Sequence, residues 1–411
     1  MPLRPALALC AALACGAAHA GDGADWEVRG FGTAAATWVA THDAEFARFN
    51  QEAGADGKPR YDIDSNLGLQ ATRHLDATIS ATVQALVRKD ASRHVRGELA
   101  WAFLKARLSP QWSVRAGRLG APIYMLSDYR NVGYANTAVR PPQEVYSMVL
   151  ADHVDGIDAT WRQGSGDTTW SAQAFAGHAN TEVLGGGTVG QLEQHPITGL
   201  SLSAEHGPVT VRLGHTMARL RLHLAPAEQV LDALRGAASA YAMPGLASLA
   251  GRLALDNKRA SFSSAGISVD ASRLLLQSEY ARRRVTGFGS ANHAWYVLAG
   301  YRFGSLMPYL GRAALGIDSV VANTVPLACP AGAPAACTPT MAALHAKVDL
   351  GTQAPQQATT TAGLRWDLRP ALALKLQLDR ITPRNGNGLL LRMPGARGQV
   401  TVATLALDAV F

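Results

Sequence analysis

The sequence predicts an all-β fold, a transmembrane antiparallel β-barrel of about sixteen strands. Three observations predict it. Apolar and polar residues alternate over many segments, short turns and longer connections follow one another in a regular order, and the chain stops inside a strand at Phe411. Alternation with a period of two gives each strand one apolar and one polar face. We expect the apolar faces to meet lipid and the polar faces to meet water inside the barrel.

The first residues predict a secretory signal peptide over 1–20. Arg4 precedes an apolar run that closes with Ala18-His19-Ala20, a small-x-small cleavage pattern. The run is too short to span a bilayer as a helix. A buried N-terminal helix is the alternative. With cleavage, the mature chain is 21–411 and lies outside the cytoplasm.

Two cysteines remain after cleavage, Cys329 and Cys337, and they flank the segment PAGAPAA. In an exported protein this spacing favours one disulfide that fastens a loop. A metal site is the alternative, but it requires further soft ligands nearby, and the sequence has none there. We therefore expect no metal and no cofactor.

The formal net charge is +7, which becomes +6 once Arg4 leaves with the signal. For an exported chain this excess favours anions or acidic lipid headgroups as partners, and not nucleic acid. Apolar residues make up 48% of the chain and the mean hydropathy is +0.01. Both values fit a soluble protein as well as a barrel, so the periodicity has to decide.

The alternation is clearest from Asn66 to Arg88, where a short reversal at 74–76 separates two strands. In the second strand Ala77, Ile79, Ala81, Val83, Ala85 and Val87 alternate with polar residues. An earlier segment, 26–41, has the same character, with Glu27 and Arg29 on its polar face.

Short turns are predicted at 109–110, 164–167, 206–208, 270–272, 303–305 and 369–370, where Gly, Pro, Asp and Ser gather. Longer connections are predicted near 42–60, 90–95, 120–150, 179–196, 218–257, 284–291, 318–357 and 384–397. The count gives about sixteen strands, with the short turns at one end and the longer loops at the other. The long external loops are 218–257 and 318–357. Within the first, 226–242 predicts a short surface helix over the pore mouth, with a partner-binding helix as the alternative.

The segment 120–150 breaks the alternation. A loop longer than about fifteen residues is functional or disordered. The stretch Gly117–Tyr146 is rich in tyrosine and carries both signs of charge, whereas disordered segments are poor in aromatics. Its Pro141-Pro142 pair removes two amide donors. We expect this segment to fold into the lumen of a wide barrel and to form a constriction.

The last two hairpins place charges and leucines on opposite faces. Leu364, Trp366 and Leu368 alternate with Arg365 and Asp367. A dry core does not accept such charges without partners, whereas a water-filled barrel does. The final strand ends at Phe411, and closure requires it to pair with 26–41, which leaves no edge.

On these features the chain resembles Gram-negative outer-membrane porins of the general, sixteen-stranded type. The resemblance covers the whole mature chain and rests on the signal peptide, the paired-strand rhythm, the terminal Phe411 and the long third loop, GRLGAPIYMLSDYRNVGYANTAVRPPQEVY. It implies a location in the bacterial outer membrane, reached through the periplasm, contact with outer-membrane lipid, recognition of Phe411 by the barrel-assembly machinery, and a homotrimer.

The resemblance also implies a water-filled channel for small hydrophilic solutes and ions. It places Asp128, Arg130, Arg140 and Glu144 on the loop side of the constriction. Alternation places further charges on the barrel wall: Arg29, Arg88, Arg115, Arg273, Arg283, Arg302, Arg365, Lys375 and Arg392, against Glu27, Glu279, Asp367 and Asp379. The excess is basic, so we expect weak anion selectivity. For any one arginine, a paired wall residue or a headgroup contact is the simpler interpretation.

A substrate-specific channel for phosphate, carboxylates or sugars is the alternative function. Tyr124, Tyr129, Tyr134 and Tyr146 would offer sugars a stacking path, or would pack the loop against the wall. An adhesin or a purely structural barrel is a further possibility. An enzyme is not expected, because the loop histidines lie in no G-x-S-x-G, H-E-x-x-H or paired His-Asp pattern.

Overall fold

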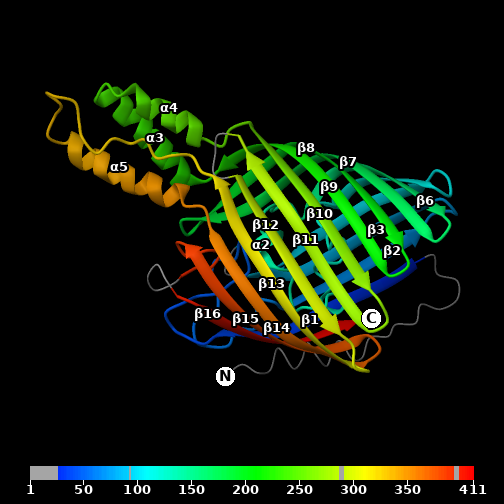
Figure 1. Cartoon of the computed structure of the whole chain (residues 1–411). Helices are drawn as coiled ribbons and strands as arrows, with labels where there is room; N and C mark the ends of the chain where they lie inside the picture. Colours follow the sequence, from blue (N-terminus) through cyan, green and yellow to red (C-terminus); the bar gives the residue numbers. More distant parts are fainter. Residues whose placement is uncertain (1–25, 92–93, 287–290, 393–397) are drawn as a thin grey trace.

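The computed structural model describes residues 26–91, 94–286, 291–392 and 398–411, and its centre is a closed barrel of sixteen antiparallel strands (Figure 1). The expected signal peptide at 1–20 lies outside the described residues. The strands are β1 (Trp26–Val39), β2 (Asn66–His74), β3 (Ile79–Lys89), β4 (Val95–Arg107), β5 (Trp112–Gly120), β6 (His153–Ser165), β7 (Thr168–Gly185), β8 (Thr188–His206), β9 (Val209–His223), β10 (Lys258–Asp270), β11 (Leu274–Val285), β12 (Ala291–Tyr301), β13 (Leu306–Ser319), β14 (Gln356–Arg369), β15 (Leu372–Asn385) and β16 (Val400–Val410).

Each strand pairs with its neighbours in the chain, and the first strand pairs with the last. The register of β1 on β16 runs from Phe31 opposite Val410 to Val39 opposite Val402. Phe411 continues this seam: its amide donates to the Gly30 carbonyl at 2.9 Å, and its carbonyl accepts from the Gly30 amide at 2.7 Å. Because the sheet closes on itself, no strand edge is left for a further chain. The predicted closure is confirmed.

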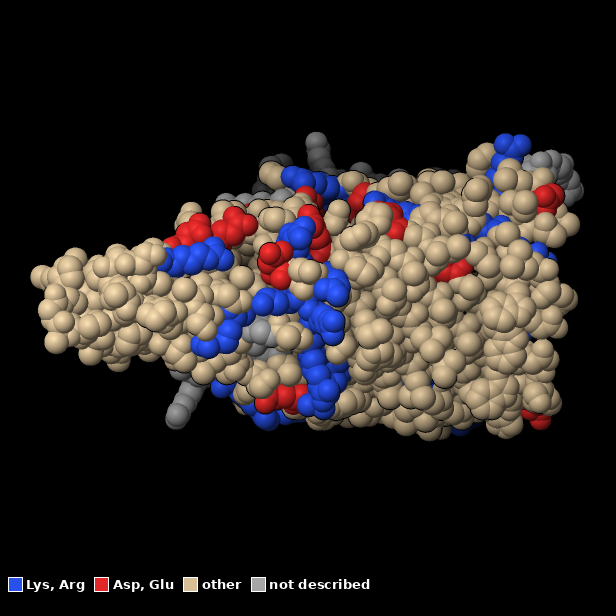
Figure 2. All heavy atoms as spheres, turned by 90° about the horizontal axis from the view of Figure 1, so that it is seen from above, with Lys and Arg blue, Asp and Glu red and all other residues tan. Residues whose placement is uncertain are grey.

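The two faces of the strands follow the predicted alternation. On β15, Leu376 and Leu378 are 45% and 46% exposed on the outside, while Lys375 and Gln377, which alternate with them, are buried inside. Figure 2 shows how few charged side chains interrupt the outer wall. On β12 both faces are apolar, since Trp295 points outward and the neighbouring Tyr296 and Leu298 are buried inside.

Every predicted turn lies in a short connection, and the long connections gather at the opposite end. One connection differs. The region 179–196, expected as a loop, continues the hairpin of β7 and β8 up to a turn at Gly186-Gly187. Both glycines have positive φ, +58° and +73°, which a two-residue hairpin turn of this kind requires.

Three helices form a lobe at the long-loop end: α3 (Ala225–Ala240), α4 (Pro244–Leu253) and α5 (Cys337–Thr352). They share an apolar core that includes Leu234, Leu249 and Met341. The disulfide between Cys329 and Cys337 lies at the start of α5. The helix predicted at 226–242 is present as α3. It does not lie over the pore mouth, however. The apolar face of α3 packs on α4 and α5. The lobe that the three helices form projects away from the barrel (Figure 1). No helix in the described part of the chain is long and apolar enough to cross a bilayer.

Candidate functional site

The connection between β5 and β6, loop 3 (residues 121–152), lies inside the barrel. It contains a 3-10 turn, η1 (Gly133–Ala135), and a one-turn helix, α2 (Gln143–Tyr146). Its residues bond to inward side chains of strands on all sides: Arg88 of β3, Arg212 of β9, Glu279 of β11, Arg365 of β14 and Lys375 of β15. Only a segment within the lumen reaches all of these strands.

Arg140 is the first anchor of loop 3. Its guanidinium contacts the Asp64 carboxylate, and its Nη2 lies 3.1 Å from Asp379 Oδ2 and donates to Thr404 Oγ1 at 2.8 Å. Burial opposes the ionisation of Asp64, but Arg140 and Arg48 outweigh it and lower the pKa of that carboxyl. The side chain of Arg140 is 5% exposed. We expected Arg140 to line the constriction, and instead its buried side chain holds the loop in place.

Lys375 of β15 is the second anchor. Its ammonium donates to the carbonyls of Gly133 and Asn136 at 2.7 and 2.6 Å and pairs with Asp408 at 2.8 Å. Asp408 also accepts from Thr33 Oγ1 at 2.6 Å. Gly133 needs its hydrogen side chain here, because a Cβ would overlap both Asp408 and Thr33. Lys375 was expected on the open pore wall, and instead it is fully buried.

Glu144 of the loop is also buried on this side, and Arg365 of β14 bonds to the loop backbone. Glu144 accepts hydrogen bonds from Gln357 Nε2 at 2.7 Å and from Thr359 Oγ1, and burial raises the pKa of its carboxyl. Arg365 donates to the carbonyls of Tyr134 and Asn136 at 2.7 and 3.0 Å. These contacts satisfy the polar groups of this side within the protein, beside a small cavity of about 40 Å³.

The tyrosines pack the loop against the wall. Tyr124 and Tyr146 stack at 4.6 Å between ring centroids, and Tyr124 meets Phe262 of β10 edge-on at 5.1 Å. The Tyr146 hydroxyl donates to Glu279 Oε2 at 2.9 Å. The guanidinium carbon of Arg365 lies over the Tyr134 ring, 4.9 Å from the ring centroid. The arrangement matches a packed interface and offers no continuous stacking path.

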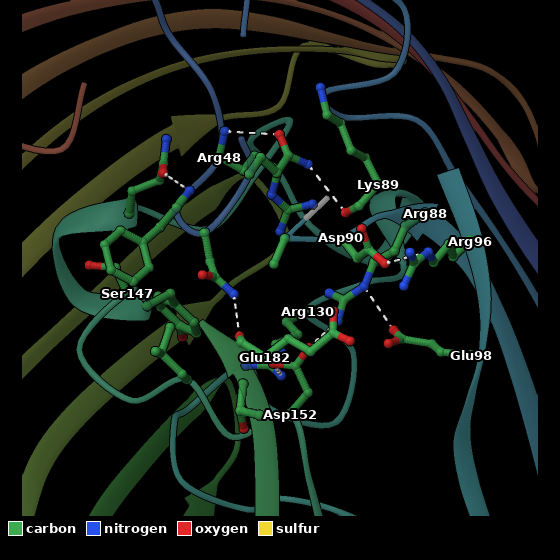
Figure 3. A pocket seen from close by; sticks show the side chains of 18 of the residues that line it. Arg48, Arg88, Lys89, Asp90, Arg96, Glu98, Arg130, Ser147, Asp152 and Glu182 are labelled. Atoms are coloured by element: carbon green, nitrogen blue, oxygen red, sulfur yellow. Dashed lines mark hydrogen bonds and ion pairs between the residues drawn. The ribbon is translucent and has the colours of Figure 1, made fainter. Parts of the chain in front are cut away.

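The opposite side of loop 3 borders two cavities. The larger, about 390 Å³, opens at the long-loop end, and the smaller, about 30 Å³, lies beyond it. Five residues border both: Arg88, Glu98, Arg130, Asp152 and His153. They therefore mark the junction between the two cavities. Figure 3 labels Arg88, Glu98, Arg130 and Asp152 at the larger cavity.

Charge pairs build this junction. Arg88 of β3 donates to Glu98 Oε1 of β4 at 2.8 Å, and both Arg88 and Arg130 contact the Asp152 carboxylate. Burial opposes the ionisation of Asp152, but the two arginines outweigh it and lower its pKa. Asp152 is therefore an anion at neutral pH. Its side chain is 34% exposed, so water reaches this cluster.

Solved structures with the same architecture include porins. They include OmpF of Salmonella typhi in complex with daunomycin, 11% identical, over 94% of this chain and 97% of that chain at a TM-score of 0.52. The anion-selective porin of Comamonas acidovorans is 13% identical. The similarity covers 94% of this chain and 99% of that chain, with a TM-score of 0.51. The high-pH structure of OprB of Pseudomonas putida is 13% identical. The similarity covers 94% of each chain, with a TM-score of 0.52. The fold is that of the sixteen-stranded porins. No protein-family model and no curated protein matches the sequence.

Three cations at the larger cavity were missed by the sequence reasoning: Arg48 of the first long connection, Lys89 and Arg96. Arg48 differs from the other two. Among the described residues its guanidinium has no hydrogen bond or ion pair, whereas Arg88, Lys89, Arg96 and Arg130 each have one. Burial, opposed by Asp64 and assisted by Arg88, lowers its pKa to about 10. It remains charged at neutral pH. The segment 42–60 gave no alternation from which to place it.

The remaining predicted residues separate into three groups. Arg115 pairs with Asp158 on the inner wall, Arg283 donates to the Met148 carbonyl at 2.9 Å, and Asp128 borders the smaller cavity. Arg29 pairs with Glu27 and Arg302 with Asp270 at the turn end, away from the constriction. Arg392 belongs to the last long connection and lies 3.7 Å from Asp56. Of the loop charges expected at the constriction, Arg130 lies at the junction.

Proposed function

We propose that this protein is a channel of the bacterial outer membrane that lets small hydrophilic solutes and ions diffuse passively, with a weak preference for anions. The observation that carries the proposal is the charged junction, where Arg88, Glu98, Arg130, Asp152 and His153 border both the larger and the smaller cavity on one side of loop 3. Charged groups around a narrow aqueous path set selectivity through their local field. No reaction, metal or cofactor is assigned to the protein.

The outer surface supports a place in a membrane. Exposed tryptophans lie near the turn end of four strands, at Trp26, Trp112, Trp170 and Trp366. Above them the outward residues are apolar, for example Leu213 and Leu310, which are 53% and 65% exposed. An apolar band with an aromatic girdle is typical of barrels that face lipid.

The balance of charge supports the anion preference. Five cations border the larger cavity, Arg48, Arg88, Lys89, Arg96 and Arg130, against four carboxylates, Asp90, Glu98, Asp152 and Glu182. Four of the cations pair with carboxylates, one of which, Asp62, lies outside the lining. Arg48 and Glu182 are therefore the lining charges without an ion pair among the described residues, and Arg48 supplies the positive field that a passing anion meets. The excess is small, which supports a weak selectivity.

Reversal potentials across planar bilayers in a KCl gradient test the proposal. We expect an open channel whose reversal potential has the sign for anions, and we expect Arg48→Glu to invert that sign. Arg302→Glu, at the turn end and away from the cavities, is the matched control and should shift the potential much less. A protein without conductance, or a clear cation preference in the wild type, would contradict the proposal.

A substrate-specific channel is the second candidate, and the small volume of the cavity beyond the junction, about 30 Å³ against about 390 Å³ for the larger cavity, favours it. Conductance that saturates with one solute would support it, whereas linear permeation limited by solute size supports the general channel.

We extend the proposal to a homotrimer, which cross-linking of the protein in detergent would test.

A further inference from the structure

Arginines gather on the outer wall of the barrel, outside the channel, at the end that bears the helical lobe. We call this group the arginine belt: Arg219 and Arg221 of β9, Arg259 of β10, and Arg282 and Arg284 of β11. Figure 2 shows Lys and Arg side chains gathered at this end of the barrel, beside a wall with few charges. The belt has no part in the proposed diffusion path.

The belt lies directly above the apolar band. On β9 the outward residues Leu213 and Met217 are 53% and 55% exposed, and Arg219 and Arg221 follow on the same face. On β11 the outward Tyr280, 48% exposed, precedes Arg282 and Arg284 in the same way. Lipid chains that cover the apolar residues would thus have their headgroups at the level of the arginines.

The charges of the belt are not balanced within the protein. Arg219 and Arg259 are direct cross-strand neighbours, an arrangement of like charges that destabilises a sheet. The Arg219 guanidinium donates to Asn257 Oδ1 at 3.1 Å, and within the described ranges the side chains of Arg259 and Arg284 have no hydrogen bond or ion pair. By contrast, Arg221 pairs with Asp256 at 2.9 Å and Arg282 with Asp318 at 2.7 Å. An external anion between Arg219 and Arg259 would remove their repulsion.

A hollow of about 400 Å³ adjoins these arginines. It forms where β8 loses its regular pairing: Gln194 lies opposite Leu220, but the next pair is Ile197 with Ala218, and Pro196 has no amide to donate. Arg219, Arg221, His178, His195, Asn180 and Asn257 line it. Glu193, also in the lining, lies 3.7 Å from Arg221. The lining thus offers many donors and a single carboxylate.

We propose that the hollow and the arginine belt bind the phosphate-bearing headgroup of an anionic lipid, whose acyl chains lie along the apolar band below. Guanidinium groups present paired N–H donors that match phosphate oxygens. The apolar neighbours Leu213 and Met217 select a lipid over a soluble anion, because they bury hydrocarbon that free phosphate lacks.

Native mass spectrometry of the full-length protein in detergent tests this inference. The probes are dioleoyl phosphatidic acid, dioleoyl phosphatidylcholine and inorganic phosphate. We expect the phosphatidic acid to bind about tenfold more tightly than the phosphatidylcholine, and Arg219→Gln/Arg259→Gln to remove that difference. Arg162→Gln is the matched control, since Arg162 is 62% exposed at the opposite rim. It should leave binding unchanged, and Arg219→Lys/Arg259→Lys should retain most of it.

Equal binding of the two lipids, or an equal loss in Arg162→Gln, would overturn the inference in favour of general attraction to positive charge. Displacement of the bound lipid by inorganic phosphate at a similar concentration would assign the site to a soluble anion. The conductance of Arg219→Gln/Arg259→Gln should match the wild type, because both residues lie outside the lumen. This measurement also shows that the variant folds, and it separates failure of the lipid site from failure of the channel.

Discussion

The two sides of loop 3 differ in how they satisfy their charges. Toward β14–β16, Arg140 and Lys375 are almost without solvent exposure and find every partner within the protein. Toward β3–β6, Arg88, Arg130 and Asp152 also pair, but their side chains remain 13–34% exposed and border cavities. A cavity of about 40 Å³ lies beside Arg140 and Glu144 on the first side, which we call the dry side because its ion pairs are buried. The dry side fixes the position of the loop, while the other, wet side leaves charges in contact with water. We expect substitutions on the dry side to change stability and those on the wet side to change transport.

The largest effect is expected from Lys375→Met. It leaves the Asp408 carboxylate buried without its cation and removes the donor to two loop carbonyls. Breaking a buried pair from one side costs about 3–5 kcal/mol. Urea unfolding of the protein in liposomes, followed by tryptophan fluorescence, measures the loss. Arg302→Met is the control, since its exposed pair with Asp270 should contribute less than about 1 kcal/mol. A Lys375→Met barrel as stable as the wild type would mean that water reaches this side of the loop.

Tyr146→Phe should have a smaller effect in the same assay. The hydroxyl donates to Glu279 at 2.9 Å and accepts from the Leu126 amide at 3.1 Å, so its removal leaves both groups short of a partner in the packed interface. The expected cost is about 1–3 kcal/mol. Tyr134→Phe is the matched control, because the Tyr134 ring stacks on Arg365 and its hydroxyl has no hydrogen bond within the described residues. Equal losses in the two variants would contradict the assignment.

Glu144 predicts a pH dependence. Burial raises its folded-state pKa above the ordinary value of 4.5, so the folded protein favours the protonated form. The contribution of this group is therefore complete below the unfolded pKa and is lost as pH rises through the folded pKa. Glu144→Gln, which is neutral throughout, should flatten this decline. Unfolding free energies measured from about pH 4 to pH 8 test the slope. A wild-type stability that increases through that interval, with no change in Glu144→Gln, would contradict it.

The sequence predicted the barrel well because a period of two is a local property. On β15, Leu376 and Leu378 alternate with Lys375 and Gln377, and this alternation identifies the outer and inner faces of the strand without any knowledge of its neighbours. The count of strands, the turns and the closure at Phe411 followed from the same pattern. The region 179–196 was mistaken for a loop because its bulges at His178 and at His195-Pro196 interrupt the alternation.

The dry side of the lumen was not predicted, for a physical reason. Tyr296 and Leu298 face inward on a strand whose outward residues, Trp295 and Val297, are also apolar, so the sequence of β12 does not distinguish the faces. Nor does alternation reveal whether an inward charge meets water or a loop. Asp64 and Asp379 reach Arg140 from segments far apart in the chain, and only the folded loop brings them together.

Asp152→Asn should have the smallest effect on stability and a clear effect on transport. At neutral pH Asp152 is an anion held between Arg88 and Arg130, and removing its charge leaves two arginines at the junction without that counter-charge. Because water reaches the cluster, the expected loss of stability is about 1 kcal/mol or less. The reversal potential in a KCl gradient at neutral pH should move further in the direction of anions. Asp155→Asn is the control, since its pair with Arg118 borders neither cavity. If Asp152→Asn instead destabilised the barrel as much as Lys375→Met and left selectivity unchanged, the junction would be a third anchor of the loop and not part of the path.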